Sequence, residues 1–430
     1  MPGPVINNVT RFFKLLQMML FAAAIQAQPA KSVLKAIPAS FAYKNEMGQF
    51  IFVPGGEFRS GIVNGHDSLT LILPAVASVN LFYLNQYEVS NAAYREFVKY
   101  VLDSTAKQLL GHFVAGSSKI DWTQSINWDH QLLAPLIIPS EKRWYGKKEI
   151  DTDKILYRFE NGETQAVYPD TLVWIRDFAY SYNEPMTKRY FAHPAFDNYP
   201  VVGVSAKQAI AYCEWKTRKW NESLVSTKSN LKITLRLPAA NEWEYAAQQG
   251  AEMLTENHNR AFNIFDRTQT KAYPNPANPE PDNHIRNLGY KYNFGRIVGP
   301  HGFMVKSYAD DGCFYTAPRN AYKAGNTGCY NLHGNVAEWT SSAGSENPLL
   351  KKDSLLTKLI HDLSSSYPRS PLANKNADKI GEWLRQFTIV KGGSWESDPY
   401  YLQPGVNQYF REMEQHSFIG FRLAMDITKL

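Results

Sequence analysis

The stretch of the chain richest in potential metal ligands is NLHGNVAEW, at residues 331–339. It places the Asn331 amide and the Glu338 carboxylate on either side of Gly334, in a glycine-containing segment that is predicted to form a turn. Amide, carbonyl and carboxylate oxygens gathered in this way are the ligands of a hard cation such as calcium, which takes about six or more of them. This stretch supplies too few by itself. Taken alone, it favours a capped turn entering a strand over a calcium site.

Other familiar catalytic patterns are missing. The sequence has no Walker loop, no GxGxxG after a strand, no HExxH, no GxSxG and no CxxC. Its ten histidines are scattered, and a single histidine such as His193 or His333 is more typical of a structural hydrogen bond than of a base or ligand. No zinc site is predicted.

The cysteines are few. Cys213, Cys313 and Cys329 are an odd set, which leaves at least one thiol outside any disulfide. Cys213 lies on the apolar face of a predicted helix and is interpreted as core filling. For Cys313 and Cys329, in loop-like sequence, a disulfide and two thiols stay open as alternatives, because sequence does not supply the geometry.

The composition is that of a folded protein. Of 430 residues, 44% are hydrophobic and 20% are charged. The net charge of +6 is spread along the chain without Lys/Arg runs, so there is no footprint for nucleic acid.

The first 27 residues are typical of a secretory signal peptide. Arg11 and Lys14 precede an apolar run at 15–25, and small residues ending at Ala27 offer a cleavage site. The alternative is an ordinary amphipathic helix over 12–27. No other segment approaches transmembrane length, so the mature protein is expected to be soluble. No cysteine lies near the cleavage site, so no lipid is expected there.

Short strands and capped helices are predicted to position these residues. Strand signals at 50–58, broken by PGG, and at 79–87 are followed by Ser90, a helix N-cap. Behind it, apolar residues recur at helical spacing, which predicts a buried face: Tyr94, Phe97, Val98 and Val101.

Two further helices are predicted downstream. Ser205 with Gln208 forms a capping box, and Ala206, Ile210 and Cys213 are expected to share the buried face of the helix that follows. A third helix is expected after Pro238. Weakly patterned stretches near 104–190, 266–305 and 343–385 are interpreted as insertions into one domain at 45–430, after a polar segment at 28–44.

Seven motifs, in this order, resemble those of the formylglycine-generating-enzyme (sulfatase-modifying factor) family. They are FVPGGEF at 52–58, NQYEVSN at 85–91, YPVVGV at 199–204, RLP at 236–238 with EWEYAA at 242–247, NLHGNVAEW at 331–339, KGGSW at 391–395 and GFR at 420–422. The resemblance implies an α+β, C-type-lectin-related mixed fold with little regular secondary structure and long insertions. One departure is Ala239, where the family usually has a hydroxyl residue that caps a helix.

The catalytic positions of that family differ here. Its members carry two cysteines after the GGS, which bind copper and activate oxygen to oxidise a substrate cysteine. The matching positions hold Ser397 and Leu402, in a former active-site cleft that also includes Ser394 and Trp395. Copper(I) needs soft thiolate ligands, whereas a hydroxyl is hard and leucine has no ligand atom. The resemblance therefore implies a pseudo-enzyme without copper.

The resemblance also implies structural calcium at two sites. One matches Asn331 and Glu338 with the carbonyls of Gly334 and Val336. The other consists of Asn263 and Asp311 with the carbonyls of Ile264 and Cys313, and its alignment is less secure because of the insertion at 266–305.

A narrower resemblance appears at YPDTLVWIRDFAYSYNEP, residues 168–185, and YFAHPAFDNYPVVGV, residues 190–204. These segments are similar to the gliding-motility and type IX secretion proteins of the GldK and PorK kind, outer-membrane lipoproteins that form a periplasmic ring with a partner subunit. The missing lipid-accepting cysteine departs from that group. It leaves three alternatives: a soluble paralogue, retention through a partner, or a different start codon.

The leading hypothesis is a non-catalytic ring or scaffold subunit of the type IX secretion and gliding-motility machinery. It would lie in the periplasm, associated with the outer membrane only indirectly, with other machinery subunits as partners in a homo-oligomeric ring. One alternative is an enzyme of the superfamily with non-copper chemistry, although the histidine-rich helical domain of its iron-dependent members is not visible here. Another is a ligand-binding module that uses the former cleft; side chains filling that cleft would count against it.

Overall fold

The structure is a computed structural model that describes residues 38, 40–61, 75–177, 184–250, 292–295, 297–298, 304–306, 312–325, 327–344, 385–397 and 399–430. The predicted signal peptide at 1–27 lies outside the described residues, as do most of the insertions near 266–305 and 343–385.

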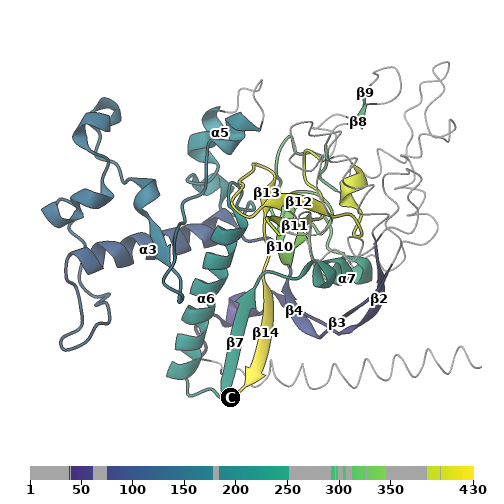
Figure 1. Cartoon of the computed structure of the whole chain (residues 1–430), viewed down its shortest axis with the longest axis horizontal. Coiled ribbons are helices and arrows are strands. Elements are labelled where there is room, and N and C mark those ends of the chain that lie inside the picture. The colour runs from purple at the N-terminus through teal and green to yellow at the C-terminus, as the bar shows by residue number, and fades with distance from the viewer. Residues whose placement is uncertain are drawn as a thin grey trace, which may run out of the picture.

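The first sheet gathers strands from both ends of the chain. Its order is β1 (Phe50–Val53), β4 (Phe82–Asn85), β14 (Ala424–Lys429) and β7 (Leu231–Arg236), and every pair is antiparallel. Along β7 buried and exposed side chains alternate, as expected for a strand with one face on the core. The C-terminal strand therefore lies inside the sheet and closes the domain (Figure 1).

The second sheet has the order β12 (Gln408–Arg411), β11 (Phe387–Lys391), β10 (Ala337–Ala343) and β13 (Ile419–Gly420), and only the β10–β13 pair is parallel. Between β13 and β14 the chain crosses from this sheet to the first one. The residues at that crossing are therefore placed to contact both sheets.

Three long helices confirm the predicted starts. In α3 (Asn91–Leu109) the Ser90 hydroxyl accepts the Ala93 N–H, and the face predicted to be buried is buried. In α6 (Ala206–Ser226) both hydrogen bonds of the Ser205–Gln208 capping box are present. Tyr94 of α3 stacks on Tyr212 of α6 at 5.6 Å between ring centroids, which packs the two helices together.

The helix α7 (Ala240–Gly250) starts without a hydroxyl cap. At Ala239, the Glu242 carboxylate accepts the backbone N–H at 2.8 Å. The Ala240 N–H is satisfied from another element, by the Ser342 hydroxyl of β10 at 3.1 Å. The missing hydroxyl is thus offset by one local and one tertiary acceptor.

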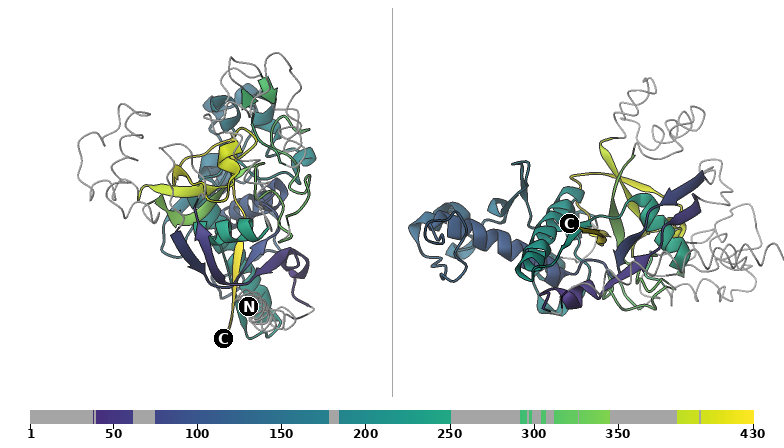
Figure 2. Two further views of the ribbon diagram at one scale, coloured as in Figure 1. Left: turned by 90° about the vertical axis from the view of Figure 1, so that its right-hand side faces the viewer. Right: turned by 90° about the horizontal axis from the view of Figure 1, so that it is seen from below.

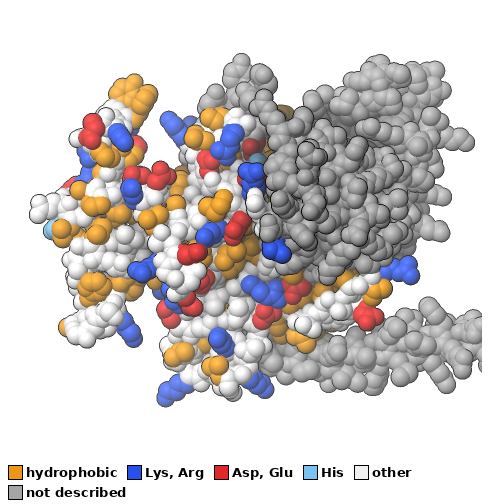
Figure 3. Space-filling model, in the orientation of Figure 1, with side chains coloured by type: hydrophobic (Ala, Val, Ile, Leu, Met, Phe, Trp, Pro, Cys, Tyr) orange, Lys and Arg blue, Asp and Glu red, His pale blue; other side chains and the backbone are white. Residues whose placement is uncertain are grey.

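Residues 110–154 form an arm that stands out from the body beyond α3 and α6 (Figures 1 and 2), and the residues that follow return to the core, where Tyr157 and Val167 are buried. The weak periodicity of this part of the sequence corresponds to a series of short elements. They are η1 (Gln131–Leu136), η2 (Ser140–Lys142), η3 (Trp144–Gly146), η4 (Thr152–Lys154), β5 (Leu156–Arg158) and β6 (Thr164–Ala166). On the face shown in Figure 3 the arm carries hydrophobic side chains interspersed with Lys and Arg.

The remaining described elements are short. They are α2 (Lys44–Met47), β2 (Gly56–Ser60), β3 (Ala75–Val79), α4 (Val173–Arg176), α5 (Glu184–Arg189), η5 (Pro194–Phe196), β8 (Ile297–Val298), β9 (Met304–Lys306) and η11 (Pro399–Leu402). Strands β2 and β3 pair antiparallel, as do β5 with β6 and β8 with β9.

One expectation about the core is corrected. Ile210 is 41% exposed, because it lies at the edge of the α6 face centred on Ala209, Lys216 and Trp220. Ahead of residue 45, Phe41 is buried and its ring lies 5.7 Å from that of Trp220.

The structure bears on the predictions for the cysteines and for membrane-spanning segments. Cys213 is buried in the core, as predicted, and within the described ranges no disulfide joins Cys313 to Cys329. No helix in the described part of the chain is long and apolar enough to cross a membrane.

Candidate functional site

The turn at residues 392–394 sets the backbone of the segment at 394–402, which the family resemblance predicts to be a former active-site cleft. Gly392 and Gly393 have φ values of 95° and 64°, in the left-handed region that favours glycine. A Cβ on Gly393 would meet Leu402 Cδ1 at 2.9 Å, so the glycine lets the Leu402 side chain pack directly on the turn.

The two serines that follow are bonded to each other. The hydroxyl oxygens of Ser394 and Ser397 are 2.9 Å apart, and the Ser397 hydroxyl also accepts the Ser394 N–H at 2.9 Å. Both side chains are buried. The Ser397 oxygen is therefore used within its own turn.

The other cleft residues are buried too. Leu402 and Trp395 are each 1% exposed, and the Trp395 indole N–H donates to the Ser417 carbonyl at 3.2 Å. The Nδ1 of His333 lies 2.8 Å from the Leu402 carbonyl, which agrees with its predicted structural role. The structure thus brings Ser394, Ser397 and Leu402 together around one turn and fills the space between them with their own side chains.

Helix α4, in the insertion at 104–190, packs against this segment. Trp174 is 2% exposed, and its ring stacks on Trp395 with centroids 6.2 Å apart. The centroid of the Tyr190 ring lies 4.7 Å from that of Trp174. Next to α4, the Asp177 carboxylate accepts the Ser417 N–H at 2.7 Å. The insertion therefore holds the C-terminal loop and Trp395 together.

Titratable groups gather beside this contact. Burial, with the nearby charge of Asp177, raises the pKa of Glu396 to about 7. Although burial acts in the opposite direction, hydrogen bonds from His416 and the Ser417 N–H lower the pKa of Asp177. The His416 Nδ1 lies 3.4 Å from the Asp177 carboxylate.

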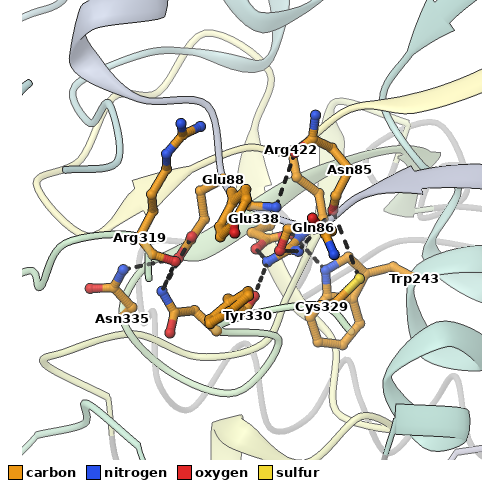
Figure 4. A network of polar contacts seen from close by, with 12 residues as sticks. Asn85, Gln86, Glu88, Trp243, Arg319, Cys329, Tyr330, Asn335, Glu338 and Arg422 are labelled. Atoms are coloured by element: carbon orange, nitrogen blue, oxygen red, sulfur yellow. Dashed lines mark hydrogen bonds and ion pairs between the residues drawn. The ribbon is translucent and has the colours of Figure 1, made fainter. Parts of the chain in front are cut away.

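A second polar centre surrounds Glu338 on β10 (Figure 4). Its Oε2 accepts the Arg422 Nε–H at 2.6 Å and the Trp243 indole N–H at 2.7 Å, and its Oε1 accepts the Arg422 Nη2 at 2.5 Å. Glu338 and Arg422 are both fully buried. Burial lowers the pKa of Arg422, whereas the Glu338 carboxylate raises it. The net shift of the pKa is upward, so the guanidinium stays charged.

Glu88 is a third buried charge in this centre, at the start of the segment that leads into α3 (Figure 4). Its two oxygens accept amide N–H groups of Asn335 at 2.9 Å and of Asn331 at 3.3 Å. Burial raises the pKa of Glu88 to about 7, with Arg422 opposing and Glu338 adding to the rise. Arg422 therefore pairs with Glu338 and, through its charge alone, opposes the rise in the pKa of Glu88.

The first predicted calcium site falls in this centre. The structure places Asn331 and Glu338 at the two ends of one loop, with Gly334 and Val336 buried between them. The Asn331 amide nitrogen donates to Glu88 and to the Arg319 carbonyl, and Glu338 already binds a cationic side chain through both oxygens. As arranged, this donor set does not fit calcium, because its single carboxylate is neutralised by Arg422.

The second predicted calcium site is only partly described. Asn263, Ile264 and Asp311 lie outside the described residues, and Cys313 is half-buried. In the described ranges no group of three or more His, Cys, Asp or Glu side chains is placed to hold a metal.

Sequence reasoning missed Glu88, Arg422 and Trp174 as site residues. Glu88 and Arg422 lie in motifs that the sequence displays, and a charged residue flanked by Tyr87 and Val89 was a usable signal for burial. For Trp174 the tryptophan itself is visible, but its contact with Trp395 joins segments more than 200 residues apart and has no local signal.

Comparisons with known proteins identify a family that matches most of the chain. The model of the family described as "Sulfatase-modifying factor enzyme 1-like domain" matches residues 38–427. Formylglycine-generating enzyme of Mus musculus is 25% identical over 381 residues, which cover 87% of this chain and 74% of the mouse protein. The enzyme of Bos taurus is 24% identical over 291 residues, 67% of this chain and 56% of the bovine protein.

Among solved structures, PvdO from Pseudomonas aeruginosa matches at 16% identity and a TM-score of 0.41, covering 88% of this chain and 94% of PvdO. CarF is 14% identical with a TM-score of 0.37, covering 87% of this chain and 97% of CarF. The mixed helices and sheets, the ordered motifs and a family match over nearly the whole described chain lead to one assignment. The fold is α+β and formylglycine-generating-enzyme-like, and the chain belongs to the family of sulfatase-modifying factor enzyme 1-like domains.

Proposed function

We propose that this protein is a non-catalytic structural subunit, a ring or scaffold component of a type IX secretion and gliding-motility machinery. Its partners would be other subunits of that machinery. We place it in the periplasm, exported by its signal peptide and held at the outer membrane through a partner.

The loss of catalysis is supported by the chemistry of the former cysteine positions. Ser397 offers a hydroxyl already bonded to Ser394, and Leu402 offers only carbon to the turn. The thiols of Cys213 and Cys329 are buried, and burial raises the pKa of both, to about 11 for Cys329. Neither supplies the thiolate that copper(I) requires at neutral pH.

The observation that carries the proposal is the contact between Trp174 and Trp395. A domain that admitted a peptide beside the 394–402 segment would need room there, whereas this insertion packs a buried tryptophan against that segment. The same insertion contains residues 168–185, which, together with the following residues 190–204, resemble the secretion and motility proteins. Its packed inner face and the exposed Leu172 and Ile175 are what an assembly surface on a filled domain would have.

Structural calcium is implied by the family resemblance, whereas the first site as arranged favours the ion pair of Arg422 with Glu338 over the metal. At the first site it would require Glu338 to exchange Arg422 for the metal. No part of the scaffold function proposed here depends on it.

The alternative of a superfamily enzyme with non-copper chemistry has one observation in its favour. Glu396, with a pKa of about 7 beside Asp177 and His416, has the protonation behaviour of a general acid or base. The burial of Trp395 and Leu402 counts against the second alternative, a ligand-binding module in the former cleft.

The test is an affinity purification of the tagged full-length protein from its native envelope, followed by mass spectrometry and sizing. We expect a large assembly that contains other secretion subunits. In a Leu172→Ser, Ile175→Ser variant we expect the partners to be lost while the melting temperature is kept, because both side chains are exposed on or beside α4. Val225→Ser, at a 72% exposed position on α6, is the matched control.

Two outcomes would contradict the proposal. One is a monomer that co-purifies with no secretion subunit. The other is conversion of a cysteine-containing peptide to its aldehyde by the wild-type protein with copper and oxygen, which would restore the enzymatic interpretation.

A further inference from the structure

A cavity of about 800 Å³ lies where the arm meets α3 and α6. Its walls come from the second half of α3, the segment at 118–122, strand β5 with the two residues that follow it, and one face of α6. We call it the arm cavity. Its volume is within the range of small-ligand sites, and it is separate from the filled segment at 394–402.

One wall of the arm cavity is aromatic. The rings of Tyr100 and Trp122 stack with centroids 5.1 Å apart and an interplanar angle of 23°. Trp122 is 45% exposed, and the Nζ atoms of Lys219 and Lys107 lie 5.6 and 5.9 Å from its ring centroid, so the exposed part of the indole lies close to positive charge. A flat, half-exposed indole supported from behind by a second ring suits the C–H face of a sugar ring.

Cations dominate the charge of the arm cavity. Lys119, Arg158, Arg218 and Lys219 line it against two carboxylates, Glu160 and Glu222. Lys219 lies 3.4 Å from Glu222 and 4.4 Å from the centroid of the Tyr100 ring. Within the described part of the chain, no carboxylate forms an ion pair with Lys119, Arg158 or Arg218, so these three cations can bind an anion.

Neutral hydrogen-bonding groups complete the lining. The hydroxyls of Ser104 and Thr105 donate to the Val101 carbonyl, each at 2.9 Å, which leaves their oxygens as acceptors. The Gln108 amide supplies both a donor and an acceptor beside them. Sugar hydroxyls, which donate and accept, match such groups better than a peptide of acidic side chains does.

We propose that the arm cavity binds an anionic saccharide, with a sugar ring on Trp122 and its carboxylate or other acidic group on Arg218 and Lys119. The chemistry fits a free oligosaccharide or the acidic sugar of a larger envelope glycan. This ligand is recognised outside the former active-site segment.

The test is isothermal titration of the purified full-length chain with tri-galacturonic acid and with maltotriose at low and high salt. We expect tri-galacturonic acid to bind, maltotriose to bind at least about tenfold more weakly because it lacks the carboxylates, and salt to weaken the acidic ligand. Trp122→Ala and Arg218→Gln should each weaken tri-galacturonic acid by about tenfold or more. Trp144→Ala, at a 74% exposed tryptophan of the arm outside the cavity, should leave the affinity unchanged.

The variant Lys119→Gln separates lost binding from lost folding. Because Lys119 is exposed, this substitution should weaken binding with no change in melting temperature. The proposal fails if tri-galacturonic acid does not bind, or if Trp122→Ala and Lys119→Gln bind it as the wild type does. It also fails if a tri-glutamate peptide binds and tri-galacturonic acid does not, which would identify an acidic protein as the ligand. The free source and the glycan are distinguished by repeating the titration with envelope polysaccharide.

Discussion

At the turn that carries Ser394 and Ser397, the identity of single atoms decides which ligands the side chains can offer to a metal. The Ser397 oxygen is hard, protonated at neutral pH and bonded to the Ser394 hydroxyl and N–H. Leu402 adds carbon contacts to Gly393. These residues stabilise the turn, and nothing in their arrangement supports a soft metal.

Glu88 carries a prediction about pH. Its pKa of about 7 lies above the value of 4.5 expected of an unfolded chain, so the folded state binds the proton more tightly. The free energy of unfolding should therefore fall as pH rises from about 5 to about 8. Ionisation of the buried Glu88 should lower it by on the order of 3 kcal/mol at most. Glu88→Gln keeps the shape without the charge, and urea unfolding should show a smaller loss between those pH values than in the wild type.

The control is Glu96→Gln, an exposed position on α3, which should keep the wild-type pH dependence. If Glu88→Gln instead loses the same stability at both pH values, Glu88 is ionised in the folded state and bound to Arg422.

At the scale of elements, the loop at 331–338 and helix α4 determine how the site is built. The loop needs left-handed backbone at Asn331, Gly334 and Asn335, and a Cβ on Gly334 would meet the Asn293 carbonyl oxygen at 2.2 Å. Helix α4 buries Trp174 on Trp395. The loop presents Glu338 to Arg422, while α4 covers the turn that carries Ser397.

The loop carries a prediction about calcium. Because the Glu338 oxygens already accept three N–H donors, we expect the same melting temperature in chelator and in calcium at about 0.1 mM, a concentration that saturates tighter sites. Differential scanning calorimetry of the full-length chain measures this. A calcium-dependent rise that disappears in Asn331→Ala would show that the loop exchanges its arginine for the metal.

At the scale of the molecule, buried charges join the two sheets and the helices. Arg422, at the crossing from β13 to β14, reaches Glu338 on β10 and the carbonyls of Asn85, Gln86 and Tyr330. On the other side, Lys391 of β11 binds Glu244 of α7 at 3.1 Å, and Glu244 also accepts the Gly61 N–H at 2.7 Å. Distant segments are thus tied through fully satisfied polar groups, which a low-dielectric core requires.

Arg422 carries the prediction at this scale. Arg422→Met should lower the free energy of unfolding by about 3–5 kcal/mol, because it leaves Glu338 buried without its counter-charge. The double variant Arg422→Met, Glu338→Gln should be more stable than the single variant, since it removes the unpaired charge. Urea unfolding compares them, with the exposed Arg411→Met as control.

If Arg422→Met does not fold, Arg422→Lys is used in its place, because it keeps the charge and loses the bidentate hydrogen bond. Its free energy of unfolding should lie between those of the wild type and of Arg422→Met. A single variant as stable as the double variant would mean that Glu338 is not ionised in the core.

The sequence by itself determined the family motifs, the starts of α3 and α6, and the presence of Ser397 and Leu402 where the resemblance implies cysteines. These features depend on residue identity and on hydrogen bonds or periodicity within a few residues, as in the Ser205–Gln208 capping box. Only the tertiary structure decided that Arg422 pairs with Glu338, that Trp174 covers Trp395, that Ile210 faces outward and that the arm leaves a cavity. Those outcomes depend on contacts between segments far apart in the chain, whose geometry is set by strand pairing and core packing and leaves no local pattern in the sequence.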